Sequence, residues 1–461
     1  MTLPVKATKN APKPGISAVL GLVDETNYGP SHWTTEAYNN IFEKFNYADA
    51  NDEQLLEAQE VLFHEYDYMV GRGVVSFIDV DKNADSHPGY PARYIYEKEA
   101  EMIAEMGLEE YEHFKVCFEK SDYNPLWYGF LKSETMKREK IDRQDIRLIA
   151  CAPAQYTRLG ATYEMKPNCA LKRRTNTKQA QVGWRPIEGG FNRVIKRFDQ
   201  CTWMMEMDWT RYDGTIPTKV WDAVNQYRIA AIATTPRERK IYAKYRASLS
   251  DRMTVLPTGD LVHMTKGNPS GQYSTSVDNC MCQTLLTFYE TRDWIIHSTG
   301  ETPTVKQVFD SHVTVSYGDD RLTGWTDHGD YAYCFPPTKD WLVNYYKTKF
   351  GMWVKPENIR IQQERVGLSF CGMTVKEGNN GYVPIFRSPK LLSALATPSR
   401  EVATLEELEA KVVSLAHLTA WDDTHEARQI RQGLHTLERI DPSFKAPERE
   451  AMRMFWEDQR S

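Results

Sequence analysis

Two acidic residues stand side by side at the end of a strand-like segment, and this feature restricts the fold more than any other. Residues 312–320 read HVTVSYGDD. The alternation in HVTVSY predicts a half-buried strand, and Gly318 permits a tight reversal that brings Asp319 and Asp320 to its tip. Adjacent carboxylates repel each other. A divalent cation such as Mg²⁺, which prefers oxygen ligands, would offset that repulsion, whereas without a cation the pair is an ordinary turn.

A metal site would need a second acidic strand end. Residues 203–209, WMMEMDW, predict a strand that delivers Asp208, and Asp213 follows it. Positions an odd number apart face opposite sides of an unbroken strand, so a turn must lie between Arg211 and Gly214 if both acids serve one site. Full extension would separate the two acids by about 16 Å. We therefore expect Asp213 at the rim of the site; unrelated acids on a surface strand are the alternative.

The segment KGNPSGQYSTSVDNC, residues 266–280, predicts a flexible loop followed by a helix. Thr275 and Asn279 are four residues apart and therefore lie on one helical face. A hydroxyl and an amide below a glycine-containing loop can bind the hydroxyls of a sugar. The alternative is a helix whose hydroxyl residues only cap its first turn.

A fourth segment carries basic residues at wider spacing. In LKSETMKREKIDRQDIRLIACAP, eight residues separate Lys132 from Lys140 and seven separate Lys140 from Arg147, with Glu134 as an internal partner. Cations that converge on one channel could hold a triphosphate. Each of them alone would be an ordinary solvated side chain.

Length and charge distribution add further limits. A chain of 461 residues is too long for one core, so we expect two or three sub-domains. The net charge of −6 gives no indication of a nucleic-acid partner, but residues 166–197 hold nine basic residues against one acid. That segment is either a solvated face or a surface that binds phosphates.

The remaining patterns indicate local structure and compartment. The eight cysteines form no CxxC pair, the start has no signal-peptide pattern, and no run approaches about 18 apolar residues, so we expect a soluble intracellular protein. We predict helices over about 35–70 and 97–120, after Pro217, over 276–296 and from 389 onward; strands at 146–150 and 369–375; a hairpin over 250–266; and loops with short strands over 160–197.

Taken in order, the four segments resemble motifs F, A, B and C of viral RNA-dependent RNA polymerases. The intervals agree as well: 61 residues separate Arg147 from Asp208, 62 separate Asp208 from Ser270, and 49 separate Ser270 from Asp319. The amino-acid sequences of the motifs also resemble one group: DWTRYDGTIP, KGNPSGQYSTSVDN and YGDDRLT are similar to segments of the astrovirus RNA polymerase. In that virus group the polymerase is the C-terminal part of a replicase polyprotein. The resemblance is strongest over residues 130–375.

The resemblance implies an α+β right-hand polymerase fold of fingers, palm and thumb, with an antiparallel palm sheet flanked by helices. The implied divisions are an N-terminal extension and fingers with motifs G and F over 1–198, palm with motif A over 199–218, a fingers insertion over 219–266, palm with motifs B to E over 267–388, and a short helical thumb over 389–461.

The resemblance also implies an activity, namely two-metal-ion nucleotidyl transfer from NTPs to a primer 3′-hydroxyl with Mg²⁺ or Mn²⁺. It assigns catalysis and metal binding to Asp208, Asp319 and Asp320. It assigns binding of the nucleotide and its ribose to Asp213, Ser270, Thr275 and Asn279. Binding of the triphosphate is assigned to Lys132, Lys140 and Arg147. Contact with template and primer is assigned to Gly89, Pro91, Gly271, Phe370, Cys371 and Gly372. The motif D general acid stays open among Lys347, Lys349, Lys355 and Arg360.

The partners implied are an RNA template and primer, NTPs, a genome-linked protein primer and other viral replicase proteins, in membrane-associated replication complexes in the cytoplasm of the infected cell. Two rival functions are a reverse transcriptase, which would place a bulky side chain near Asp213 and lack Asn279, and a non-catalytic RNA-binding replication scaffold. The acids that catalysis needs are all present, which disfavours the scaffold.

Overall fold

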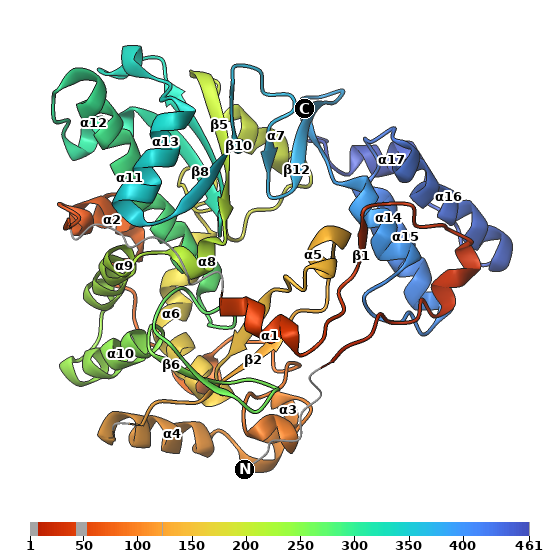
Figure 1. Cartoon of the computed structure of the whole chain (residues 1–461), viewed down its shortest axis with the longest axis horizontal. Coiled ribbons are helices and arrows are strands. Elements are labelled where there is room, and N and C mark those ends of the chain that lie inside the picture. Colours follow the sequence, from red (N-terminus) through yellow and green to blue (C-terminus); the bar gives the residue numbers. More distant parts are fainter. Residues whose placement is uncertain (1–7, 43–52, 122, 461) are drawn as a thin grey trace.

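A four-stranded antiparallel sheet carries the acidic strand ends. The structure, a computed structural model, describes residues 8–42, 53–121 and 123–460. The sheet has the strand order β10-β5-β9-β8 (Figure 1). Its members are β5 (Cys201–Thr210), β8 (His312–Tyr317), β9 (Asp320–Thr326) and β10 (Trp353–Gln362).

Both faces of this sheet are covered, with an apolar face of β5 that contains Met205 and Met207 and an opposite, more polar face that contains Met204, Glu206 and Asp208. Met205 and Met207 pack in the core that contains α11 (Thr275–Thr299), whereas Met204 packs with α7 (Gly190–Lys196) and a small sheet. That small sheet consists of β11 (Ser369–Phe370), β12 (Met373–Glu377) and β13 (Tyr382–Ile385). Further elements beside the palm sheet are α12 (Val305–Asp310), the 3-10 helix η6 (Ala332–Cys334), α13 (Lys339–Tyr345) and the π-helical turn η7 (Tyr346–Phe350).

A second mixed sheet, with the order β4-β2-β6-β7, lies among the helices of the N-terminal half (Figure 1). Its strands are β2 (Trp127–Leu131), β4 (Leu148–Cys151), β6 (Arg252–Val255) and β7 (Leu261–Met264). The surrounding elements are α2 (Ala58–Tyr66), η3 (Asp67–Met69), η4 (Phe77–Asp79), η5 (Ala92–Tyr94), α3 (Glu99–Met106), α4 (Glu109–Lys120), α5 (Arg138–Asp142), α6 (Ala154–Lys172), α8 (Tyr212–Thr215), α9 (Thr218–Ala231) and α10 (Pro236–Ser248).

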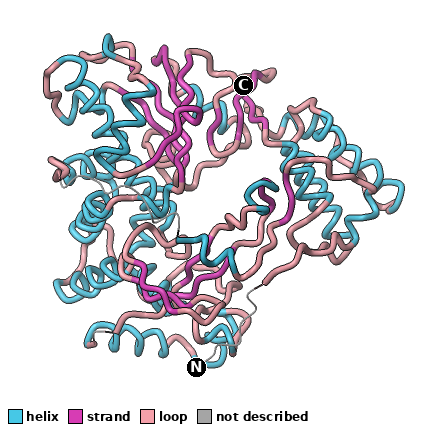
Figure 2. The backbone as a smooth tube through the Cα atoms, in the orientation of Figure 1, coloured by secondary structure: helices cyan, strands magenta, loops and turns pink. Residues whose placement is uncertain are grey.

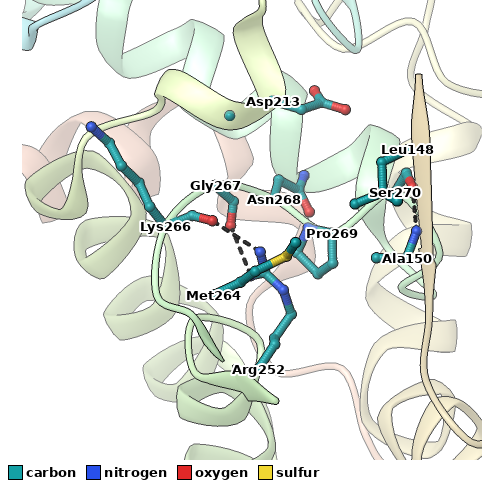
Figure 3. Close-up of a pocket in the computed structure, with 11 residues that line it drawn as sticks. Leu148, Ala150, Asp213, Arg252, Met264, Lys266, Gly267, Asn268, Pro269 and Ser270 are labelled. Carbon is teal, nitrogen blue, oxygen red and sulfur yellow. Dashed lines mark hydrogen bonds between the residues drawn. The ribbon is translucent and has the colours of Figure 1, made fainter. Parts of the chain in front are cut away.

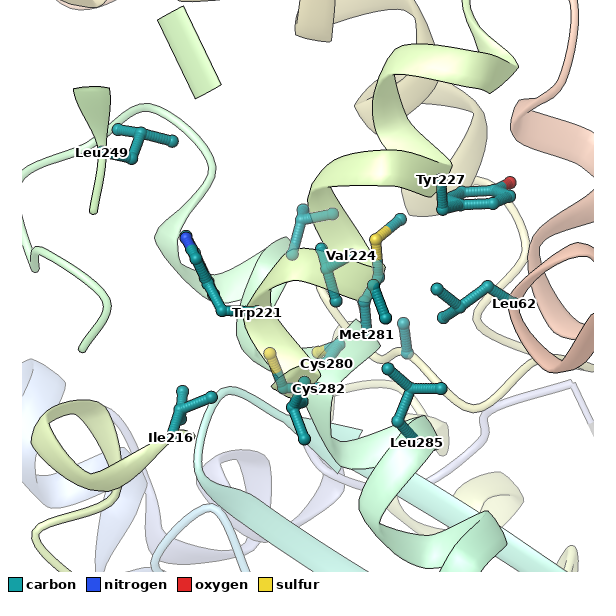
Figure 4. Packing of buried hydrophobic residues seen from close by; sticks show 14 of the residues in the cluster. Leu62, Ile216, Trp221, Val224, Tyr227, Leu249, Cys280, Met281, Cys282 and Leu285 are labelled. Atoms are coloured by element: carbon teal, nitrogen blue, oxygen red, sulfur yellow. The ribbon is translucent and has the colours of Figure 1, made fainter. Parts of the chain in front are cut away.

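One hydrophobic core joins these finger helices to the palm. Leu62 of α2, Tyr227 of α9 and Leu285 of α11 pack together in it (Figure 4). Side chains of this kind contribute about 1.5–3 kcal/mol each when fully buried. The helices around the second sheet and the four-stranded sheet therefore share a core, whereas the C-terminal helices have a core of their own.

The C-terminal helices are α14 (Ser388–Ala396), α15 (Leu405–Leu418), α16 (His425–Ile440) and α17 (Arg449–Met454). The N-terminal segment runs against them before it returns to the fingers (Figure 1). It contains η1 (Ile16–Leu20), β1 (Tyr28–Pro30), which pairs with β3 (Thr135–Lys137), and α1 (Glu36–Asn40). Leu20 is part of the C-terminal core and the Ile16 amide donates to the Val402 carbonyl. Figure 2 shows the predominantly helical C-terminal region beside the sheets.

Most elements predicted from the sequence are present. The strand at 146–150, the hairpin over 250–266, the helix after Pro217, the long helix after residue 275 and the C-terminal helices are confirmed. The helix predicted over 35–70 is present as α1 and α2, and its residues 43–52 lie outside the described part of the chain. The single strand predicted over 369–375 is instead a hairpin, because Cys371 and Gly372 have positive φ angles and reverse the chain. None of the described helices combines the length and apolarity required to cross a membrane.

The prediction of loops with short strands over residues 160–197 is right only for residues 173–189, which are loops and turns. Residues 160–172 and 190–196 are helical instead, in α6 and α7, and α6 contains Pro167. The buried face of α6 contains polar residues, such as Arg158, Glu164 and Asn168. They interrupt the recurrence of apolar residues at every third or fourth position, which is the sequence signal for a helix. These residues are compatible with burial because each has hydrogen-bonding partners.

A buried ionic cluster of four side chains links the finger helices to α11. Glu164, Arg228, Arg246 and Asp278 come from α6, α9, α10 and α11, and each is at most 3% exposed. Arg246 Nη1 lies 2.8 Å from Glu164 Oε2 and 2.8 Å from Asp278 Oδ2. Arg228 donates to Asp278 Oδ1 at 3.1 Å. The two positive and two negative charges offset each other inside the core.

Candidate active site

The two acidic strand ends lie next to each other. β5 and β9 are antiparallel neighbours in which Glu206 pairs with Leu322. Asp208 lies two residues further along β5 and Asp320 two residues earlier on β9, so the same register brings both to one end of the sheet. Asp319 occupies the turn between β8 and β9. Segments far apart in the chain thus deliver three carboxylates to one place.

The electrostatics of the three acids follow from this arrangement. Burial, then the charges of Asp319 and Asp208, raise the pKa of Asp320 to about 7. Burial and the charge of Asp208 also raise the pKa of Asp319, while Arg147 opposes that shift. Like charges disfavour simultaneous ionisation. A cation between these carboxylates would stabilise their ionised forms.

These acids fit an open metal site. Within the described residues, no three carboxylate, imidazole or thiol side chains converge closely enough to form a complete metal cage. Mg²⁺ needs no such cage when it works on phosphates, because it binds one or two carboxylates and keeps its other positions for water and substrate oxygens. The hard anionic oxygens of Asp208, Asp319 and Asp320 are donors of that kind.

Gln283 on α11 holds the acidic turn and was missed by sequence reasoning. Its side chain is fully buried, and its Nε2 donates to the backbone carbonyl of Asp319 at 2.9 Å. Gln283 lies four residues after Asn279 and eight after Thr275, so helical spacing places all three on one face of α11. That spacing is the signal that could have identified it.

Asp213 lies beyond a turn of the chain, as the strand geometry required. Arg211 has a φ of 56°, and the short helix α8 follows it. Asp213 Oδ1 accepts a hydrogen bond from Asn279 Nδ2 at 3.0 Å. A Cβ at Gly267 would lie 2.5 Å from the carbonyl oxygen of Asp213, so the loop can approach α8 only with glycine there. The structure therefore brings together two residues that the sequence assigned to the ribose.

The hydroxyls of Ser270 and Thr275 contact the loop and its neighbours. Ser270 Oγ accepts from the Ala150 amide at 3.2 Å, and Thr275 Oγ1 donates to loop carbonyls, including that of Pro269 at 3.0 Å. A Cβ at Gly271 would lie only 2.1 Å from the Ala150 carbonyl oxygen. The loop therefore packs directly on β4, and the predicted contact of Ser270 and Thr275 with ribose stays a prediction.

A small pocket lies between part of this loop and strands β4, β6 and β7 (Figure 3). Asp213, Arg252, Asn268 and Ser270 are among its lining residues, and its volume is about 40 Å³. That is room for a few water molecules and far too little for a nucleotide. Arg252 donates to the Lys266 carbonyl at 2.9 Å and so fixes the start of the loop.

Two of the predicted triphosphate ligands lie beside strands of the second sheet, Lys132 directly after β2 and Arg147 directly before β4. Arg147 Nε donates to Glu134 Oε1 at 2.7 Å, and Lys132 Nζ lies 3.4 Å from the same carboxylate. The pKa of Arg147 is raised, first by Glu134 and to a smaller extent by Asp319 and Asp213. The Arg147 side chain is 66% exposed. Lys140 is exposed on α5.

The predicted template and primer residues lie in three places, one of which is Gly271 in the loop described above. Gly89 has a φ of 81° and its Cβ would lie 2.6 Å from the Ala152 carbonyl oxygen, while Pro91 follows a cis peptide bond. Phe370 is buried beside α7, and Cys371 and Gly372 form the β11–β12 turn. The charges of Asp320 and Asp319 contribute, after burial, to the raised pKa of Cys371. This second turn therefore lies near the acids.

The four motif D candidates differ in their contacts. Lys349 Nζ donates to Asp293 Oδ2 at 2.6 Å, and Lys347 Nζ lies 5.4 Å from the centroid of the Trp353 ring. Arg360 donates to the Gly367 carbonyl at 2.6 Å and lies 3.6 Å from Glu206. Lys355 is exposed in β10.

The basic segment 166–197 is partly structural. Arg197 Nη1 donates to the carbonyls of Thr175 and Lys178, and Arg174 lies 4.8 Å from the Tyr68 ring centroid. Other basic residues of the segment are exposed, namely Lys166, Lys172, Arg173, Arg185, Arg193 and Lys196. Their role along a template or nucleotide channel stays a prediction.

Sequence comparison identifies the family. A model of the viral RNA-dependent RNA polymerase family matches residues 12–432. The chain is 38% identical over 426 residues to the non-structural polyprotein 1AB of Turkey astrovirus 2, which covers 89% of this chain and 26% of that protein. It is 36% identical over 434 residues to the corresponding polyprotein of Mink astrovirus 1, with 90% and 30% covered. The chain thus spans about a quarter to a third of the length of these relatives.

Structural comparison supports the fold. A Sicinivirus 3Dpol RNA-dependent RNA polymerase superposes with a TM-score of 0.71 at 15% identity, and the match covers 99% of this chain and 98% of the other. This likeness confirms the predicted right-hand polymerase fold, and the astrovirus relatives confirm the resemblance seen in the motifs. The chain therefore belongs to the viral RNA-dependent RNA polymerase family.

Proposed function

We propose that the chain copies RNA by joining the 3′-hydroxyl of a primer to the α-phosphate of an incoming NTP. The observation that carries this proposal is the meeting of Asp208 with Asp319 and Asp320 at one end of the palm sheet. Two divalent cations, Mg²⁺ or Mn²⁺, would supply charge for the attacking oxygen and the leaving pyrophosphate. Asp208 and Asp319 would hold them, and Asp320 would support the site.

The side chains around the acids fit the rest of the substrate. Arg147, whose side chain is largely exposed, is available to the triphosphate. Lys132 and Arg147 both contact the Glu134 carboxylate, and Lys140 is nearby in sequence. Asp213 and Asn279 would hydrogen-bond the ribose 2′-hydroxyl. A site built for that hydroxyl rejects substrates without it, because its polar atoms are then left unpaired. This arrangement disfavours a reverse transcriptase.

Primer extension tests the function directly. With a primed RNA template, ribonucleotides and Mg²⁺, we expect addition of nucleotides that stops when the metal is chelated. With deoxyribonucleotides we expect an efficiency on the order of 10³-fold lower. A preference for deoxyribonucleotides would identify a reverse transcriptase, and RNA binding without any extension would identify a scaffold.

Lys355 is the motif D residue that the geometry favours. In the β10–β5 pair, Val354 lies opposite Trp209 and Ile359 opposite Met207, so residues 355–358 bulge beside Asp208. Lys355 is exposed and lies in this bulge of β10, next to Asp208 of β5, a position from which it could protonate the leaving pyrophosphate. The other lysines have contacts elsewhere, Lys349 with Asp293 and Lys347 with Trp353.

We expect Lys355→Leu to lower the rate of nucleotide addition about 100-fold, the lower range for loss of a general acid. Rapid-quench extension measures this rate. Lys347→Leu is the matched control and should keep nearly the full rate. Equal losses in both variants would refute the assignment.

The broader context is also part of the proposal. We propose the sub-domain limits given above, with a thumb of residues 389–461, and RNA template, primer and other replicase proteins as partners. The short thumb would leave a wide channel for a genome-linked protein primer. Extension from nucleotides alone, as efficient as extension from such a primer, would remove the support for protein priming. Replication complexes on cytoplasmic membranes of the infected cell are the proposed location.

A further inference from the structure

A row of three buried amide side chains connects the ionic cluster to Asp213. Gln272 Nε2 lies 2.9 Å from Asp278 Oδ2 and 2.8 Å from Asn268 Oδ1. Asn268 Nδ2 donates to Asn279 Oδ1 at 2.8 Å. Asn279 Nδ2 then donates to Asp213 Oδ1 at 3.0 Å. We call Gln272, Asn268 and Asn279 the amide relay; Figure 3 shows Asn268 of the relay below Asp213.

The chemistry of its ends fixes the direction of every hydrogen bond in the relay. Asp278 is held ionised between two arginines, which together with Gln272 lower its pKa against the effect of burial. An ionised carboxylate only accepts, so Gln272 must present its NH₂ group to Asp278. The second N–H of Gln272 reaches Asn268 Oδ1, which leaves the NH₂ group of Asn268 to donate to Asn279.

The same argument fixes the direction of the hydrogen bond to Asp213. Asn279 accepts through Oδ1 from Asn268, so its own NH₂ group must point to Asp213. Without Asn268, Asn279 Oδ1 would lose its buried donor, and the Asn279 amide would no longer be held where it donates to Asp213. Gln272, Asn268 and Asn279 are 7%, 5% and 4% exposed, so water cannot easily replace the missing partner.

We propose that Gln272 and Asn268 are positioning residues for ribose selection, which hold the Asn279–Asp213 pair in the orientation that reads a 2′-hydroxyl. This inference rests on the proposed polymerase function. It assigns a specificity role to two residues that touch neither the metal-binding acids nor the predicted triphosphate ligands. Asp278 and the two arginines anchor the relay at its buried end.

Two variants test the relay. Gln272→Met keeps the length of the side chain and removes both relay hydrogen bonds, together with the one that Gln272 Oε1 accepts from the Ser274 amide. Asn268→Ala removes the middle of the relay. For each, extension with single ribonucleotides and deoxyribonucleotides gives the ratio of the two efficiencies. We expect this ratio to fall about tenfold, the value of one buried hydrogen bond, with deoxyribonucleotide efficiency changed less than twofold.

The matched control is Tyr242→Phe. The Tyr242 hydroxyl donates to Glu164 Oε2 at 2.8 Å, so this variant disturbs the ionic cluster without touching the relay. It should lower the melting temperature and leave the ribose ratio unchanged. Equal losses for both nucleotide types in the relay variants, or an unchanged ratio, would overturn the inference while the polymerase function stands. A native chain that extends with neither nucleotide type would refute the function itself.

Discussion

Asp319→Asn is expected to lower nucleotide addition by about 10³-fold or more, because the amide removes the negative charge that the metal site requires. Metal ions contribute several kcal/mol of transition-state stabilisation, and each 1.36 kcal/mol corresponds to tenfold in rate. The turn itself should persist, because Gln283 holds Asp319 through its backbone carbonyl and not through its side chain. Asp208→Asn should show a loss of similar size.

The measurement is single-nucleotide extension of a primed RNA template at saturating Mg²⁺. Asp310→Asn provides the matched control, because Asp310 forms an exposed pair with Lys306 on α12, away from the acidic turn. RNA binding measured by fluorescence anisotropy should be nearly unchanged in all three variants. An Asp319→Asn variant with more than about a tenth of the native rate would show that this carboxylate does not hold a catalytic metal.

The catalytic acids could be predicted from sequence because their signals are local. A strand that ends in Gly318 and two aspartates can be predicted without knowledge of distant contacts. The alternation of apolar and polar residues near the end of β5 is an equally clear signal. The pairing of β5 with β9 is non-local, and only the order and spacing of the motifs indicated it. The relation of Asp213 to Asn279 was accessible through helical spacing and the turn at Arg211.

Residues that act through buried polar contacts were not accessible in this way. Gln283, Gln272 and Glu206 each bond to a segment distant in sequence or to a buried charge. A polar residue in a helix or a loop is usually solvent-exposed, so its sequence gives no signal for burial. For the same reason α6 was predicted as loops and short strands, since its buried face includes Glu164 and Asn168.

A substitution in the buried ionic cluster is expected to have the second large effect, a loss of stability. Arg246→Met is expected to lower the free energy of unfolding by about 3–5 kcal/mol, because Glu164 and Asp278 would remain buried with only Arg228 to offset two negative charges. Methionine fills much of the volume of arginine, so the loss would report charge more than a cavity. Urea unfolding followed by tryptophan fluorescence measures it, and Trp221, whose ring centroid lies 5.4 Å from the Arg246 guanidinium, is a local probe.

A second substitution separates charge from packing in this result. Glu164→Gln in the Arg246→Met background removes the one negative charge in excess of Arg228 and should restore part of the lost stability, because the two residues form one network and their effects are not additive. Arg237→Met is the matched control: Arg237 pairs with Glu119 at 2.7 Å, its side chain is 68% exposed, and surface pairs of this kind contribute little. If Arg246→Met and Arg237→Met unfold at the same urea concentration, or if Glu164→Gln adds to the loss, the cluster does not join the finger helices to α11 in the way its geometry indicates.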